Sequence, residues 1–203
     1  MALLGAFAVP RAPARVAIHW DLAGHPNGYA DPLSGLLGLP VYALILYVVM
    51  RLAPRLDPRR ARYARFAGAY AALRLGTTAL LAVSQWIIVT TALGRHPDVA
   101  MLSALAVGLF LLLTGAVLRR LPPNAVAGVR TPWTRRSPRV WVATQRQAGR
   151  LLTLLGLVTV AAGVAGVTRA VVVPVVGALV VGSLGLIAYS YLAWKLGSPS
   201  ASP

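Results

Sequence analysis

Two segments of the chain carry the side chains whose types could do chemistry. In the first, His19, Asp21, His25 and Asp31 lie close together in the sequence and are all potential metal ligands. Their spacing matches no firm metal-binding signature such as His-Glu-x-x-His. We therefore expect neither a metal nor any other cofactor here.

Turn residues surround these polar side chains. Gly24 and Pro26 favour a turn, and Asn27-Gly28 is a hairpin signal. We expect a hydrogen-bonded cap that rests on a bilayer, with Trp20 and Tyr29 at the interface.

The second segment begins at Asn124 and continues through Gly128-Val129-Arg130-Thr131-Pro132-Trp133-Thr134 to Trp141 and Thr144. A loop that only fixed membrane orientation would need only Arg and Lys. The added tryptophans, Asn, Gly and Pro predict a fixed fold. Ser137-Pro138 predicts the N-cap and first residue of a helix. Contact with anionic lipid and binding of a protein partner remain equally favoured roles.

The composition limits which elements could position these segments. The 203 residues are 58% hydrophobic and only 12% charged, whereas soluble domains carry about 25% charged residues. The mean hydropathy is +0.71. The net charge of +16 would suggest nucleic acid in a soluble protein. In an apolar chain, the arginines would face an anionic leaflet instead, so we expect no direct nucleic-acid binding.

Five stretches carry no charge and are long enough to cross a hydrocarbon core as helices: Pro32–Met50, Leu75–Gly94, Val99–Leu118, Leu151–Thr168 and Ala170–Trp194. The sequence thus predicts an all-α integral membrane protein with a five-helix transmembrane bundle. Polar in-span residues such as Gln85 are expected to bond across helices or to their own helix. Pro40 and Pro174 are expected in first helical turns.

Basic residues are unevenly distributed between the connections. Sixteen would lie on one side with the Arg-rich loops 51–74 and 119–150, and four on the other. Because Lys and Arg are retained inside, we expect the N-terminal segment outside a bacterial plasma membrane and Lys195 with the C-terminus in the cytoplasm. Met1–Ala8 is too short to span, so we hypothesise an upstream start that supplies a sixth, N-terminal span.

The expected organisation has five parts. Residues 1–35 form the extracellular segment, and 36–118 form spans one to three with the cytoplasmic loop 51–74. Residues 119–150 form the second cytoplasmic loop, 151–196 the last two spans, and 197–203 a disordered tail. The oligomeric state does not follow from the sequence.

Together the two segments resemble the SdpI family of bacterial membrane proteins, from about Pro13 to about Gly163. The first matches the family's pattern at Pro13, His19, Trp20, Gly24, Pro26 and Tyr29. The second matches at Asn124, Gly128, Val129, Arg130, Thr131, Pro132, Trp133, Thr134, Trp141, Thr144 and Gly149. The chain departs from the family at Ala17, Asp21, Asn27 and Gln145.

The resemblance implies a non-enzymatic protein that gives immunity to a secreted peptide toxin, or signals by holding a small helix-turn-helix repressor at the lipid bilayer. Toxin recognition would then use the extracellular residues His19, Trp20, Asp21, Gly24, Pro26, Asn27 and Tyr29. Partner binding would use Asn124, Gly128, Arg130, Thr131, Pro132, Trp133, Thr134, Trp141 and Thr144. The alternatives are a small-molecule transporter or channel, which the lack of an ionisable residue in mid-span disfavours, and a metal-dependent membrane enzyme.

Overall fold

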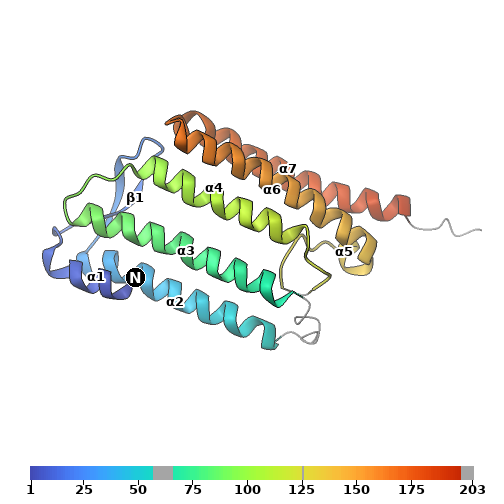
Figure 1. Cartoon of the computed structure of the whole chain (residues 1–203), viewed down its shortest axis with the longest axis horizontal. Helices are drawn as coiled ribbons and strands as arrows, with labels where there is room; N and C mark the ends of the chain where they lie inside the picture. Colours follow the sequence, from blue (N-terminus) through green and yellow to red (C-terminus); the bar gives the residue numbers. More distant parts are fainter. Residues whose placement is uncertain (57–65, 125, 198–203) are drawn as a thin grey trace, which may run out of the picture.

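A computed structural model describes residues 1–56, 66–124 and 126–197. Five long helices run side by side: α2 (Pro32–Leu56), α3 (Ala67–Ala92), α4 (Val99–Leu118), α6 (Pro138–Val164) and α7 (Thr168–Gly197) (Figure 1). All five are long and apolar enough to cross a membrane. The predicted all-α membrane fold with five spans is confirmed.

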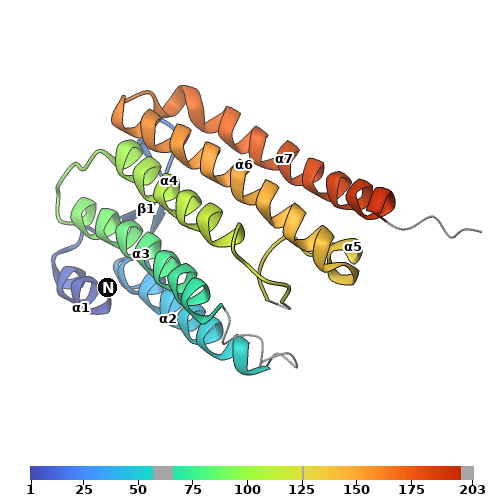
Figure 2. The same ribbon diagram turned by 45° about the vertical axis from the view of Figure 1, so that its right-hand side comes forward.

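The smaller elements mark the two ends of this bundle. Helix α1 (Ala2–Ala8), the turn η1 (Val9–Arg11) and the strands β1 (Val16–Trp20) and β2 (Pro26–Ala30) gather at one end, which we call the hairpin end. The short helix α5 (Pro132–Arg136) lies at the opposite end, beside the start of α6 (Figure 2). We call this the arginine end.

The helices extend beyond the uncharged stretches. Arg51 and Arg55 lie within α2, and Arg139, Arg146 and Arg150 lie within α6. Arginine is a good helix former, and its long stem can follow apolar surface while its head reaches water. Helix α6 begins at Pro138 behind the Ser137 cap, as predicted, so 119–150 is an irregular segment followed by the first turns of α6.

Two predicted segments fall largely outside the described residues. The loop expected at 51–74 is helical at both ends, and its residues 57–65 are not described. The expected tail begins at Gly197, which instead ends α7, and the rest of it is likewise not described.

Glycines bring α4 and α6 into close contact. A Cβ built on Gly115 would lie 2.8 Å from the carbonyl oxygen of Gly149, and one on Gly156 would lie 2.8 Å from that of Gly108. Toward the start of α4 and the end of α6, a Cβ on Gly163 would lie 3.0 Å from the Ala104 Cβ. Such small residues let helices approach in a membrane. Ala104 and Gly108 thus take part in helix packing within the chain.

A proline shapes the contact between α2 and α3. Pro40 lies well inside α2, and Pro174 well inside α7, so the expectation that both lie in first helical turns was wrong. Proline has no amide N–H, and the Leu36 carbonyl therefore lacks its partner within the helix. Gln85 of α3 is buried and donates from Nε2 to this oxygen at 2.9 Å.

Four in-span threonine hydroxyls bond to their own helices, as expected. They are Thr77 to Leu73 at 2.9 Å, Thr78 to Arg74 at 2.9 Å, Thr90 to Trp86 at 2.7 Å and Thr114 to Phe110 at 2.8 Å, each donating to a backbone carbonyl. These bonds satisfy the hydroxyls without a polar path through the bundle.

Candidate functional site

The first candidate segment forms an antiparallel hairpin over the end of the bundle. Strand β1 pairs with β2, with Val16 opposite Ala30 and His19 opposite Gly28. Val16 is fully buried and packs with Leu36 of α2 and Ile88 of α3. The apolar start of β1 therefore anchors the hairpin, while its polar tip remains exposed.

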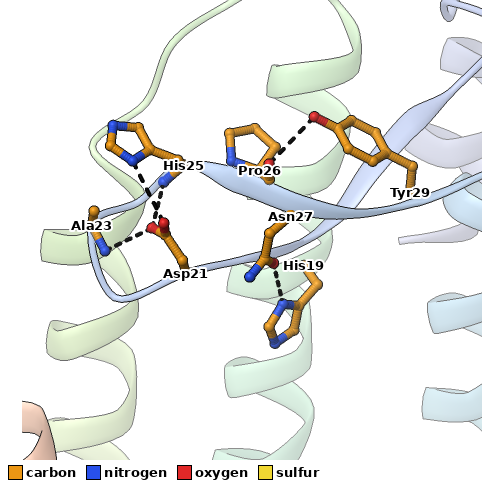
Figure 3. Close-up of polar contacts among 7 residues, drawn as sticks. All are labelled: His19, Asp21, Ala23, His25, Pro26, Asn27 and Tyr29. Carbon is orange, nitrogen blue, oxygen red and sulfur yellow. Dashed lines mark hydrogen bonds and ion pairs between the residues drawn. The ribbon is translucent and has the colours of Figure 1, made fainter.

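The turn lies at 21–25 and includes Gly24, one of the three turn signals in the sequence, whereas Asn27-Gly28 is part of β2. Asp21 Oδ1 accepts hydrogen bonds from the amides of Ala23 at 2.7 Å and His25 at 2.9 Å (Figure 3). Gly24 takes a φ of +81°, which glycine adopts without strain. A local aspartate–backbone turn thus outcompetes the Asn-Gly signal.

The same contacts determine the charge state of Asp21. The amide hydrogen bond from His25 lowers the pKa of this carboxyl below its ordinary value, followed by that from Ala23 and by the His25 ring. The ring lies 3.5 Å from Asp21 Oδ2. The hairpin tip therefore carries a carboxylate whose ionised form the fold favours.

His19 lies on β1 and points away from the turn (Figure 3). Its Nδ1 is 2.5 Å from Asn27 Oδ1, which can only accept, so Nδ1 donates. In the neutral ring, Nε2 is then an unprotonated acceptor. Gly28 faces this pair, because a Cβ there would lie 2.9 Å from the His19 Cβ.

Tyr29 completes the outer set. Its hydroxyl donates to the Pro26 carbonyl at 3.4 Å, and the Arg15 guanidinium lies 5.1 Å from its ring centroid. The structure thus brings His19 together with Asn27 and Tyr29 with Pro26, but keeps Asp21 in the turn. Within the described ranges, no three His, Asp or Glu side chains are grouped as a metal would require.

In the second candidate segment, buried side chains fold the loop onto α6. Buried Asn124 accepts from the amides of Val126 and Ala127, both at 2.8 Å. Further along, Gln145 of α6 holds both backbone groups of Val129, with 3.0 Å to its N–H and 3.0 Å to its carbonyl. Two side-chain amides thus replace regular backbone pairing in this loop.

Gly128 lies between these two anchors. Its φ is +107°, and a Cβ there would lie 2.8 Å from Gln145 Oε1. A larger residue would both strain the backbone and displace the amide that holds Val129.

Two threonines start α5 and tie it to α7. The amide of Thr134 donates to Thr131 Oγ1 at 3.2 Å, and that of Thr131 donates to Thr134 Oγ1 at 2.9 Å, which is a capping box. Thr131 Oγ1 also lies 2.9 Å from Oγ of the buried Ser190. Trp133 packs edge-on against Tyr191, with ring centroids 5.1 Å apart.

Trp141 and Thr144 lie deepest. The Trp141 indole donates to the Leu121 carbonyl at 2.8 Å within an apolar cluster that includes Phe66 and Tyr70. Thr144 is fully buried, and its hydroxyl has no hydrogen-bond partner among the described residues. Five of the predicted partner-binding residues are thus buried within the fold: Asn124, Thr131, Thr134, Trp141 and Thr144.

Gly128, Arg130 and Pro132 are the exposed members of the predicted set, with Trp133 half-buried. Arg130 makes no hydrogen bond or ion pair with any described residue, so its guanidinium is free to bind an acceptor. Sequence reasoning left Gln145, His25 and Ser190 out of the candidate set. Gln145 could have been found as a polar residue on the buried face of α6, whereas no local signal links Ser190 to Thr131.

Cations collect around this loop. Of the described residues, those near this end are Arg51, Arg55, Arg74, Arg119, Arg120, Arg130, Arg135, Arg136, Arg139, Arg146, Arg150 and Lys195. The described acids Asp21, Asp31 and Asp98 all lie toward the hairpin end. Among these residues, the two ends of the bundle thus differ strongly in charge.

Comparisons with known proteins bear on both segments. Residues 120–190 match the SdpI/YfhL protein family, and residues 1–44 match a domain of unknown function, DUF1648. The chain is 24% identical over 146 residues to the protein named Immunity protein SdpI of Bacillus subtilis (strain 168), covering 72% of this chain and 68% of that protein. No solved structure matches. The predicted resemblance to the SdpI family is confirmed.

Proposed function

We propose, from its match to the SdpI/YfhL family over residues 120–190, that this chain protects its own bacterial cell from a secreted peptide toxin. The observation that carries this proposal is the similarity, over 72% of the chain, to a protein named as an immunity protein. The protein is a multi-pass membrane protein, and in this proposal it protects the cell by binding the toxin. The hairpin would recognise the toxin outside, and the arginine end would face the cytoplasm.

The distribution of charge supports this orientation. Basic residues are retained on the cytoplasmic side of membranes, and those described in this chain concentrate at one end. The hairpin end, with exposed His19, Asn27 and Tyr29, would then meet molecules that arrive from outside.

A second role, signalling through a cytoplasmic repressor, rests on a different observation. The loop at 121–136 is ordered by buried hydrogen bonds, yet it displays exposed Arg130, Arg135 and Arg136. A rigid cationic surface suits a partner with carboxylates, because guanidinium forks bind them bidentately. Anionic lipid headgroups are the competing ligand for the same arginines.

The test of immunity uses the native host. A strain that lacks this gene is grown in conditioned medium from its wild-type parent, with and without protease treatment of the medium. We expect the deletion strain to lose viability in untreated medium, to survive in protease-treated medium, and to be rescued by the wild-type gene. Equal growth of deletion and parent strains under all conditions would rule out immunity as the function.

A further inference from the structure

A cavity of about 720 Å³ lies beneath the hairpin, in the half of the bundle nearest the hairpin end. Its walls come from α2, α3, α4, α6 and α7, and its roof from residues 18–22 of the hairpin. Ligand sites commonly have volumes of roughly 300–1,000 Å³, apolar walls and a few placed polar groups. Val107 and Val176 line the cavity and are themselves exposed, so it opens to the surface of the bundle.

Small residues create this space. Gly38 of α2 lines it, and a Cβ there would meet nothing within 4 Å. Ser84 of α3 and Ala100 and Ser103 of α4 contribute further short side chains. The deeper walls are aliphatic, with Leu111 and Leu179 among them. An alkyl chain fits such walls, because it leaves no polar group unpaired.

The roof is different in character, since it carries the polar side chains of His19 and Asp21 beside the indole of Trp20. His19 lines the roof, and in its neutral form with Nδ1 donating to Asn27 its Nε2 is a hydrogen-bond acceptor. Asp21 also lines the roof and adds negative charge there, although its carboxylate is bonded to the turn amides. The lining contains no lysine or arginine. A ligand head that donates hydrogen bonds and carries positive charge would complement this roof, whereas an anionic head would be repelled.

We propose that this cavity binds a lipid-type amphiphile, with its alkyl chain between the helices and a primary ammonium head beneath the hairpin. Carbon–hydrogen groups would contact Val107, Leu111 and Leu179, and the ammonium would donate to His19 Nε2 and face Asp21. This inference goes beyond toxin immunity, and its binding assay requires no toxin.

The binding test uses the full chain in phosphatidylcholine nanodiscs and a hexadecylamine probe with a diazirine in its alkyl chain. After illumination, labelled peptides are mapped by mass spectrometry. We expect labelling around Val107, Leu111 and Leu179. Among unlabelled competitors of the probe, hexadecylamine should reduce the labelling most. Hexadecyltrimethylammonium should reduce it less, because it lacks N–H donors, and palmitate should reduce it least. Phosphatidylethanolamine added to the nanodisc identifies the source of the ligand. If this lipid competes with the probe, the ligand is a bilayer lipid, and if it does not compete, the ligand is a free amphiphile.

Two glycines provide a matched pair of variants. Gly38 and Gly185 both lie within long helices with open space where a Cβ would be, but only Gly38 lines the cavity. Gly38→Leu should reduce labelling of the cavity about tenfold, which corresponds to roughly 1.4 kcal/mol of binding. Gly185→Leu should leave labelling unchanged. Equal labelling in both variants, or labels spread over the lipid-facing Leu184 and Leu192, would overturn the proposal.

The head group is tested at Asp21. Asp21→Asn retains a side-chain oxygen that can accept the two turn amides, so the hairpin should remain folded. The variant should still bind the alkyl chain but lose most of the preference for hexadecylamine over palmitate. An unchanged preference in Asp21→Asn and in His19→Phe would refute an ammonium site at the roof.

Discussion

Gln145 illustrates how single side chains hold the arginine-end loop. Its amide contacts the N–H and the carbonyl of Val129 at 3.0 Å each, as a neighbouring strand would. Because Gln145 is buried, no water replaces these bonds if the amide is removed. Gln145 thus fixes the position of the loop backbone at Val129, and with it the position of the exposed neighbour Arg130.

Replacing Gln145 should therefore destabilise the protein far more than replacing its helical neighbour Gln147. Gln145→Ala should cost about 2 kcal/mol, since the Val129 N–H is left unpaired. Gln147 meets only exposed Arg150, at 3.4 Å, and Gln147→Ala should have little effect. Thermal unfolding in detergent measures both. Equal melting temperatures for the two variants would contradict this account of the loop.

Low pH should destabilise the turn at the hairpin tip, because it protonates Asp21. Its pKa is lowered in the folded state, chiefly by the His25 amide, so its stabilising effect is present above the ordinary aspartate pKa of 3.8. The effect is lost as the pH falls through the lowered folded pKa. Hydrogen exchange of the Ala23 and His25 amides, corrected for intrinsic rates, should accelerate there. Asp21→Asn should abolish this dependence, although Asp31, whose pKa is also lowered by Ser34, still titrates.

Arg130 and Arg135 offer a test of function at the arginine end. Both are exposed, but only Arg130 lies directly between the residues that Gln145 and the Thr131 cap fix in place. If Arg130 binds a partner through its planar fork, Arg130→Lys should reduce survival in conditioned medium or repressor retention. Arg135→Lys should be silent. Membrane abundance of each variant, measured by blot, serves as the control, and wild-type behaviour of Arg130→Lys would leave the loop with only an electrostatic role.

At the scale of elements, the α2–α3 contact depends on a helix defect. Gln85→Leu should destabilise the protein by about 1 kcal/mol, because the Leu36 carbonyl loses its donor. Pro40→Ala restores an N–H to the same carbonyl, so Gln85→Leu should cost much less in that background.

A double-mutant cycle in detergent measures this coupling. Ser84→Ala is the control, because its hydroxyl bonds only to the Leu80 carbonyl of its own helix, at 3.2 Å. Additive effects of Pro40→Ala and Gln85→Leu would show that the Leu36 carbonyl does not link the two helices.

The sequence predicted elements better than their ends. Uncharged stretches located all five spans, because lipid permits only helices there. The ends differ because arginines such as Arg51 and Arg146 remain helical while their heads reach water. The sequence offered turn signals from Gly24 to Gly28 without deciding between them. The Asp21 carboxylate satisfies two amides at 21–25 and so places the turn there, whereas Asn27-Gly28 is part of β2.

The candidate sites were less predictable than the elements. Motif spacing found the loop at 124–144, yet most of its polar residues proved to be buried supports. Contacts such as Thr131 with Ser190, or Gln85 with the Leu36 carbonyl, join residues far apart in the sequence. No local pattern specifies such contacts, because they depend on how whole helices pack.

For the whole molecule, orientation is the main prediction. The concentration of cations at one end predicts that this end is cytoplasmic. A reporter fused after Lys195 should give a cytoplasmic signal, and one fused after Gly94, in the α3–α4 connection, an extracytoplasmic signal. The opposite pair of signals would invert the assignment of the two sites.

Helix α7 stands apart mechanically from the rest of the bundle. It rests mainly on α6, and it is tied to α5 by the hydroxyl pair of Thr131 and Ser190 and by the ring contact of Trp133 with Tyr191. Under a pulling force applied at the C-terminus, α7 should therefore detach first, at low force and as a separate step. Helices α4 and α6, which pack closely through glycines, should be extracted later and in one step. A force–extension trace would show these two unfolding steps in that order.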